Sequence, residues 1–255
     1  HSRYADAMSD LAILEIHGTI ARLFLNRPEK RNALSEDLLT ALRARVAELA
    51  TCADVSVVVL AGMGPTFCSG MDLKAVLSEP GAPLRLLESI AELTIELRNL
   101  PQVVVAKVHG AAIGGGCGLV AVADIALTHP DAKLGYPEVD LGVCPAVVAP
   151  WLVASVGASN ARRILLQGGT MSGLRAMEVG LVAEAVPKES LDDRTDAIVA
   201  SLAKAGPRAL AATKAHLNAI GSATLHADVR RGAQISAEVI AGPEARHRLA
   251  KIYGA

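Results

Sequence analysis

The sequence lacks a marked excess of either charge. Its 255 residues include 25 lysines and arginines against 26 aspartates and glutamates, a formal net charge of −1 at pH 7. Nucleic acids and anionic membranes attract proteins with a clear basic excess. The composition therefore argues against both as main partners, although it leaves room for a local basic pocket.

Cysteines are few, and no two have the CxxC spacing of many metal and redox sites. The four, Cys52, Cys68, Cys117 and Cys144, each lie in an apolar or turn segment. Scattered thiols of this kind are typical of a reducing compartment rather than of a disulfide framework or a zinc site. We predict free thiols and no metal.

Long apolar runs and internal repeats are also missing. No run approaches the roughly 18 residues of a spanning helix, and the start of the chain does not have the basic-then-apolar layout of a secretory signal. We therefore expect a cytoplasmic protein with no membrane partner. Because Met8 looks like a natural start, residues 1–7 are interpreted as a remnant of cloning and set aside.

Apolar residues are abundant, and they follow strand and helix patterns in turn. They make up 51% of the chain, enough to bury a large core. Residues 11–16 and 19–25 predict a hairpin joined at His17-Gly18. Ser35 then caps a predicted helix with apolar residues at helical spacing. A strand is predicted at 55–60.

Predicted strands and helices continue to alternate as far as about residue 145, and helices dominate after it. A helix over 84–100, ended by Pro101, precedes strands at 103–108 and 125–128. This order predicts an α/β layered core over residues 8–200, followed by a helical C-terminal region at 201–255. The helices predicted after Pro145 cover 146–155, 160–167, 172–179, 191–203, 207–220 and about 223–240, with one β interruption at 181–186.

Two glycine-containing turns each follow a β-branched run and open a helix. Residues 103–123 read VVVAKVHGAAIGGGCGLVAVA, and residues 55–75 read VSVVVLAGMGPTFCSGMDLKA. Glycine allows positive φ and brings bare N–H groups against a ligand, where the helix dipole favours negative charge. Together the two turns predict a paired cradle for an oxyanion.

Two other interpretations of the glycines compete with this one. A run of glycines also permits close packing of a helix on a strand. Gly116, Gly118 and Ala121 form a GxGxxA pattern similar to a dinucleotide fingerprint. That fingerprint follows its strand directly, whereas a six-residue loop separates Val108 from Gly115 here, which argues against a dinucleotide.

Four motifs in order carry a family resemblance. They are LNRPEKRNALSEDLLTAL, FCSGMDLK, HGAAIGGGCGLVAVADIAL and GYPEVDLG. The segment from about Leu11 to about Val186 resembles the enoyl-CoA hydratase/isomerase, or crotonase, family. The resemblance implies a spiral of ββα units with a helical C-terminal region for trimerisation or a lid. It also implies a homotrimer or a dimer of trimers, and an acyl thioester substrate that carries coenzyme A, with no separate cofactor.

The resemblance also assigns roles at the site. It implies oxyanion donors at the N–H groups of Met71 and Gly115, which hold the thioester oxygen while it becomes an enolate, and an acid/base at Glu138. Fixed N–H donors stabilise such a charge without reorganising. A carboxylate carries protons well when burial raises its pKa, and Pro137 with the apolar residues after Glu138 favours a partly dry setting.

One position departs from the family pattern. Hydratases of the family carry a second glutamate where this sequence has Gly118. A lone acid holds and orients a water molecule less firmly than two acids do. The activity could therefore be that of an isomerase, or that of a hydratase of branched thioesters such as methylglutaconyl-CoA. Other acids are candidates to replace the second glutamate, but structural roles are expected for them. We expect Asp72 to cap a helix, Asp124 to bond the main chain, and Glu88 and Glu92 to form a solvated helix face.

For coenzyme A, the resemblance implies adenine contacts with the main chain near Ala33 and the turn formed by Ser69, Gly70, Met71, Asp72 and Leu73. It places Lys30, Arg31 and Lys74 near the phosphates. Val147 and Trp151 are candidates for the acyl pocket, although a lone tryptophan in an apolar helix is more often core. A thioester hydrolase and a non-catalytic acyl-CoA binder are the alternatives; no GxSxG elbow supports the first.

Overall fold

A six-stranded sheet forms the centre of the computed structural model, which describes residues 11–76, 79, 81–221 and 224–253. The predicted remnant, 1–7, lies outside the described residues. The strand order is β1-β2-β3-β4-β6-β9, and only the β1–β2 pair is antiparallel. The strands are β1 (Ala12–His17), β2 (Ile20–Leu25), β3 (Val57–Gly62), β4 (Val103–Val108), β6 (Ile125–Thr128) and β9 (Glu184–Ala185). The hairpin predicted at His17-Gly18 is confirmed.

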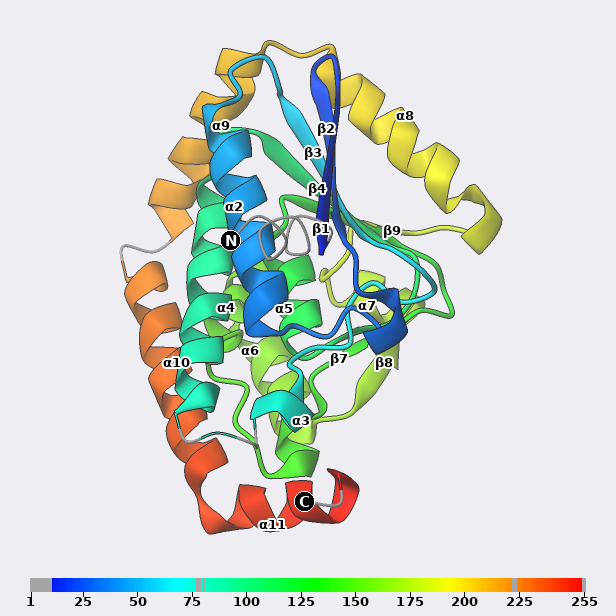
Figure 1. Cartoon of the computed structure of the whole chain (residues 1–255). Helices are drawn as coiled ribbons and strands as arrows, with labels where there is room; N and C mark the ends of the chain where they lie inside the picture. Colours follow the sequence, from blue (N-terminus) through cyan, green and yellow to red (C-terminus); the bar gives the residue numbers. More distant parts are fainter. Residues whose placement is uncertain (1–10, 77–78, 80, 222–223, 254–255) are drawn as a thin grey trace.

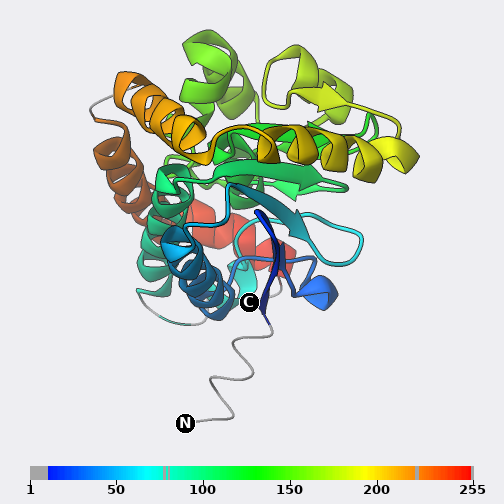
Figure 2. The same cartoon turned by 90° about the horizontal axis from the view of Figure 1, so that it is seen from above.

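Side chains of the central strands alternate between two apolar layers. Val57 and Val59 of β3 pack into one buried cluster with α8 (Leu191–Ala203), whereas Val58 and Leu60 join the larger cluster on the other face. This two-residue period is the geometry of a strand covered on both sides. Figures 1 and 2 show α8 on one face of the sheet and α2 (Glu36–Thr51) and α4 (Ala82–Asn99) on the other.

The covering helices begin at or within two residues of the predicted boundaries. The Ser35 side chain accepts a hydrogen bond from the Leu38 amide at 3.3 Å and caps α2. Helix α4 starts two residues before the predicted boundary at 84 and ends at Asn99, ahead of Pro101. These boundaries bring the apolar faces of both helices onto the sheet.

A second, three-stranded sheet was not predicted. It has the order β5-β7-β8, with β5 (Ala112–Ile113), β7 (Lys133–Gly135) and β8 (Thr170–Ser172). Strands of two or three residues are too short to show a period in the sequence. This sheet holds the start of α5 (Gly115–Val122) beside the one-turn helix η2 (Pro137–Leu141).

Helices dominate after residue 145, as predicted. Helix α6 (Ala149–Gln167) replaces the two predicted helices at 146–155 and 160–167, and Gly157 with φ 77° breaks its helical geometry between them. The remaining described elements are η1 (Pro28–Lys30), α3 (Leu73–Val76), α7 (Gly173–Glu178), η3 (Lys188–Ser190), α9 (Pro207–Gly221), α10 (Leu225–Ala241) and α11 (Pro243–Tyr253). Helix α11 was missed, because the prediction stopped near 240.

The last two helices pack on the core rather than apart from it. Val229 and Ile240 of α10 and Leu249 of α11 are buried in the same cluster as Ala12 of β1. Figure 1 shows α10 along α4, with α11 at the end of the molecule where η2 lies. Across the described residues, none of the helices combines the length and the apolar character that a membrane crossing requires.

Candidate active site

The two glycine-containing turns lie side by side. Cys68 forms a parallel bridge with Ala112, and Leu34 forms another with Met71, so the segment before α3 lies between the chain after η1 and strand β5. Gly70, with φ 87°, makes the close approach possible. A Cβ on Gly70 would stand 2.7 Å from the Ile113 carbonyl oxygen and 3.6 Å from the Gly115 nitrogen.

The bridge with Leu34 turns the Met71 amide toward the glycine turn. The Leu34 N–H donates to the Gly70 oxygen at 2.8 Å, and the Leu34 oxygen accepts from the Asp72 N–H at 2.9 Å. In a parallel bridge the residue between two bonded neighbours directs its own amide to the opposite side. Here that side faces β5 and the start of α5.

Gly115 is the first residue of α5, so its N–H has no partner within the helix. Gly114 before it has φ 53° and ψ −120°, a conformation that a residue with a side chain rarely adopts. Neither the Met71 amide nor the Gly115 amide donates to another protein group in the part of the chain that the structure describes. Two uncommitted donors therefore lie close together at the positive end of a helix dipole.

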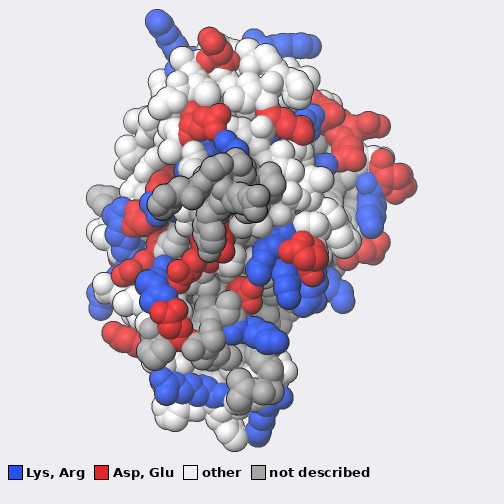
Figure 3. Space-filling view, in the orientation of Figure 1, with Lys and Arg blue, Asp and Glu red and all other residues white. Residues whose placement is uncertain are grey.

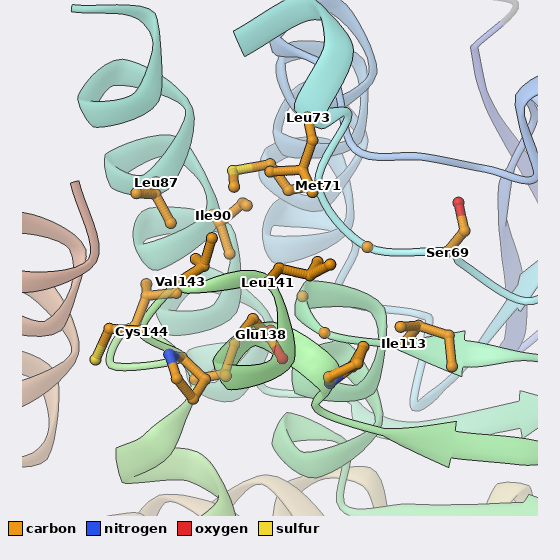
Figure 4. Close-up of a pocket in the computed structure, with 17 residues that line it drawn as sticks. Ser69, Met71, Leu73, Leu87, Ile90, Ile113, Glu138, Leu141, Val143 and Cys144 are labelled. Atoms are coloured by element: carbon orange, nitrogen blue, oxygen red, sulfur yellow. The ribbon is translucent and has the colours of Figure 1, made fainter. Parts of the chain in front are cut away.

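Both amides border a pocket of about 80 Å³. Figure 4 shows its lining side chains, which come from α4, from η2 and the chain after it, and from the two turns. Most of them are apolar, and none of the described lining residues is a lysine or an arginine. They are Ser69, Gly70, Met71, Leu73, Leu87, Ile90, Ile113, Gly114, Gly115, Pro137, Glu138, Leu141, Val143, Cys144, Pro145, Val147 and Val148.

Glu138 is the acid of this pocket, and its carboxyl is buried. A Cβ on Gly114 would lie 2.7 Å from Glu138 Oε1, so the acid lies directly against the glycine turn. Its Oε2 is buried without a hydrogen-bond partner among the described residues. Burial raises the pKa of Glu138 from 4.5 to about 7, because no nearby cation offsets the lost hydration.

The place beside Gly118 is filled by a valine. A Cβ on Gly118 would stand 2.5 Å from Val148 Cγ1, and Val148 itself is buried. The site therefore has no room on that side for a second acid unless Val148 moves. Nothing in the sequence near Gly118 indicates this contact, because the two residues lie thirty positions apart.

The predicted coenzyme A residues divide into two groups. Ser69, Gly70, Met71 and Leu73 line the pocket. Lys30, Arg31 and Lys74 are exposed and lie outside its lining. Figure 3 shows basic side chains gathered over the segment around η1, the element that ends at Lys30.

The remaining predicted contacts have structural partners. Asp72 pairs with Arg27 at 2.7 Å, and Arg27 also donates to the Ala33 oxygen at 3.2 Å. This pair ties the loop after η1 to the turn that carries Met71. Ala33 contributes its carbonyl to the tie and does not line the pocket.

Most of the other residues considered for the acyl pocket or for acid/base chemistry have structural contacts instead. Trp151 is buried, and its indole N–H donates to the Thr94 hydroxyl at 2.9 Å, so it belongs to the core, whereas Val147 lines the pocket. Asp124 accepts from the Val104 amide at 2.8 Å. Glu92 pairs with Arg230 at 2.6 Å, and neither it nor Glu88 lines the pocket.

The sequence predicts that the apolar residues after Glu138 keep the site partly dry, but it does not indicate the residues of the opposite wall. Leu87 and Ile90 contribute the wall from α4, and Leu141 and Val143 the wall from η2 and the chain after it. Helical spacing indicated that α4 had an apolar face, but a period does not distinguish a core from a cavity. The described residues contain no group of three or more His, Cys, Asp or Glu side chains arranged to hold a metal.

The fold is shared with known proteins. An enoyl-CoA hydratase from Mycobacterium avium has a similar structure, with a TM-score of 0.85, 32% identity and 96% of each chain covered. Pseudomonas aeruginosa AtuE gives a TM-score of 0.80 and 35% identity over 96% of this chain and 97% of that one. These neighbours define an enoyl-CoA hydratase fold.

The family model for enoyl-CoA hydratase/isomerase matches residues 15–248. The chain therefore belongs to the enoyl-CoA hydratase/isomerase family. Among its relatives, 2,3-dehydroadipyl-CoA hydratase of Escherichia coli is 30% identical, with 94% of this chain and 93% of that protein covered. The mitochondrial enoyl-CoA hydratase domain-containing protein 3 of Danio rerio is 35% identical over 74% of this chain and 66% of its own length.

Proposed function

We propose that this protein moves a proton on the acyl chain of an unsaturated coenzyme A thioester through an enolate, with Glu138 as the single acid/base. The proposal rests on the buried Glu138 carboxyl, whose Oε2 has no hydrogen-bond partner among the described residues, and on two uncommitted amides that border the same pocket. A group with a pKa near 7 exchanges protons readily at neutral pH. The Met71 and Gly115 amides would hold the thioester oxygen.

The proposed roles follow from the negative charge that develops on the thioester oxygen during the reaction. When a base removes a proton from a carbon conjugated with the thioester, negative charge moves onto the carbonyl oxygen. Two preorganised N–H donors stabilise that charge, and each such donor contributes about 3–4 kcal/mol in other enzymes. In isomerisation, Glu138 then returns the proton to another carbon. In hydration, Glu138 would instead take a proton from water as the water oxygen bonds to the β carbon, and would then deliver a proton to the α carbon of the enolate.

Isomerisation is the subtype that the site favours. A water molecule held for addition needs two to four polar partners, and Val148 fills the space beside Gly118 with methyl groups. Glu138 is the one carboxylate among the described lining residues. Transfer of a proton from one carbon to another requires no bound water, so a 3-enoyl to 2-enoyl shift suits this pocket.

Hydration of a branched thioester is the second candidate. The family includes proteins named hydratases, among them the Escherichia coli relative that acts on 2,3-dehydroadipyl-CoA. In methylglutaconyl-CoA the substrate's own carboxylate would help to hold the water. The described lining residues offer that carboxylate no cation, and Glu138 would repel it when charged. Neutral acyl chains are therefore preferred.

Product analysis separates these candidates. Crotonyl-, 3-enoyl- and methylglutaconyl-CoA are incubated with the protein in D₂O and examined by mass spectrometry. Isomerisation moves the double bond and exchanges carbon-bound hydrogen, hydration adds the mass of one water, and hydrolysis releases free coenzyme A. A protein that binds all three without turnover would be an acyl-CoA binder.

Glu138→Gln tests the acid/base role. The substitution keeps the shape and removes the transferable proton, so kcat should fall by about 10²–10⁴-fold while binding of the thioester persists. Glu88→Gln is the matched control, because Glu88 is an exposed acid of α4 outside the pocket lining. Full turnover by Glu138→Gln would refute the proposal.

A further inference from the structure

The turn that carries Glu138 is held on both sides by the main chain of one residue, Gly169. Glu138 lies within η2, a single turn of five residues. Two residues before it, the Tyr136 N–H donates to the Gly169 oxygen at 3.1 Å. Two residues after it, the Asp140 carboxylate accepts from the Gly169 N–H, with an Oδ2 to nitrogen distance of 2.9 Å. Gly169 thus bonds to residues on both sides of Glu138.

The backbone around Gly169 is shaped for this contact. Gly168 and Gly169 have φ of 68° and 69°, a left-handed pair that glycine adopts without a steric cost. A Cβ on Gly168 would lie 2.9 Å from both carboxylate oxygens of Asp140. Two successive left-handed residues at the end of α6 therefore let the carboxylate lie against the main chain. A side chain at Gly168 would displace it.

Glu138 has no side-chain partner of its own to fix it. Its Oε2 is unpartnered among the described residues, and its main-chain oxygen accepts from the Val143 amide at 2.8 Å. The direction of its carboxyl thus depends on the position of the turn. Proton transfer is sensitive to that position, since a misplacement of about 1 Å can cost on the order of 10²-fold in rate.

From these contacts we infer that Asp140 is a positioning residue, which holds the Glu138 turn in place by binding the Gly168-Gly169 segment. Asp140 is exposed and lies outside the pocket lining, so it acts through Glu138 and not on the substrate. The inference rests on the proposed role of Glu138. The segment that ends α6 would thus help to position the acid/base, although α6 contributes no acid to the described pocket lining.

Substitutions at Asp140 test the inference by kinetics. Asp140→Ala removes the acceptor, and kcat should fall about tenfold while KM changes less than about twofold, because the thioester contacts remain. Asp140→Asn keeps an oxygen that accepts the Gly169 N–H, and kcat should recover to within about threefold of the parent. Asp193→Ala, an exposed aspartate of α8, is the matched control and should leave kcat unchanged.

Gly169→Ala gives an independent variant if Asp140→Ala folds poorly. An added Cβ at Gly169 meets no atom within 4 Å, so the substitution disturbs the left-handed backbone alone. It should lower kcat in the same way, with KM nearly constant. A melting temperature is measured for every variant, so that loss of folded protein is separated from loss of rate.

A double-variant cycle decides whether Asp140 acts through Glu138. In the Glu138→Gln background, Asp140→Ala should cause no further loss of kcat, because there is no acid left to position. A kcat for Asp140→Ala equal to the control, equal damage by Asp140→Asn and Asp140→Ala, or losses that multiply in the cycle would each overturn the inference. Full activity of Glu138→Gln would instead refute the proposed function.

Discussion

Glu138 shows how a single buried carboxyl sets the chemistry of the pocket. Its carboxyl lies against Gly114 and receives no cation, so burial raises its pKa to about 7. Cys68 and Cys117 beneath the same turn are also fully buried, and burial raises the pKa of each thiol to about 12. Burial also raises the pKa of Cys144, the one thiol in the described pocket lining, so all three thiols are uncharged at neutral pH and Glu138 is the described lining residue whose pKa lies near 7.

The raised pKa predicts the pH dependence of turnover. If Glu138 removes the first proton, the active form is the carboxylate, and kcat/KM for a 3-enoyl thioester should rise through pH 7 and level above it. Initial rates between pH 5.5 and 9 measure this. A profile that is flat, or that rises near the ordinary carboxyl value of 4.5, would contradict the assignment.

The same shift predicts the pH dependence of stability. An acid whose pKa is raised by folding binds its proton more tightly in the native state, so it destabilises the fold progressively from about pH 4.5 to pH 7. The full effect is about 3 kcal/mol. Glu138→Gln should therefore be more stable than the parent at pH 8, measured by urea unfolding, and the difference should vanish near pH 4.

Gly118 and Val148 should be energetically coupled. Gly118→Ala places a Cβ about one bond length too close to Val148 Cγ1, at 2.5 Å, and should cost roughly 1–3 kcal/mol through overpacking. A Val148→Ala background removes the 2.5 Å contact and leaves only the Val148 Cβ at 3.2 Å from the added methyl, so the combined loss should be smaller than the sum. Denaturant unfolding of the four proteins measures the coupling, and simple additivity would rule it out.

At the scale of elements, the loop after η1 is organised by a buried asparagine. The Asn32 side chain donates to the oxygens of Met63, Thr66 and Phe67 at 2.8–3.2 Å and accepts from the Arg27 amide at 2.8 Å. Asn32 is fully buried and has φ 54°. One amide group thus fastens the loop to the segment that leads into the Met71 turn.

Asn32→Asp should be strongly destabilising. Aspartate keeps the acceptor for the Arg27 amide but replaces the donor with an oxygen that faces three carbonyls, at a cost of at least about 3 kcal/mol. Urea unfolding measures the loss. Asn99→Asp, at the exposed end of α4, makes the same chemical change and should shift stability by about 0.5 kcal/mol at most. Equal effects at both positions would contradict this role for Asn32.

The elements differ in how far the sequence predicts them. The Ser35 cap and the His17-Gly18 turn are local signals, and both are confirmed. The small sheet of β5, β7 and β8 was missed because its strands are held by partners distant in sequence and are too short to show a period. In α6 the predicted break is present as a kink at Gly157 rather than as a gap between two helices.

At the scale of the molecule, the order and spacing of the motifs predicted that the main site residues share one site. The packing around these residues could not be predicted. Met71, Gly115 and Glu138 line one pocket, although they are separated by up to 67 positions in the sequence. Their proposed roles remain predictions. Val148 above Gly118, and Asp140 bound to Gly169, depend on the course of α6, which no local pattern near those residues encodes.

The whole molecule is also expected to assemble. The family resemblance implies a trimer or a dimer of trimers, and large apolar side chains lie exposed on α6 and α9, with Leu166 70%, Leu217 58% and Ile220 66% exposed. Exposed apolar surface of this kind is typical of interfaces. Sedimentation equilibrium should give three or six times the chain mass across a tenfold dilution, whereas a monomer at all concentrations would contradict the prediction.

The shared core of the first and last elements has a consequence for biosynthesis. Ala12 of β1 and Leu249 of α11 belong to one buried cluster, so this cluster is complete only when both elements are present. On the ribosome, β1 and β2 emerge long before α10 and α11. Until these helices are synthesised, part of the apolar surface of the two strands stays exposed to solvent. The nascent protein should therefore reach its protease-resistant form only after α11 has emerged from the ribosome, and chaperones that shield such surfaces should engage it until then.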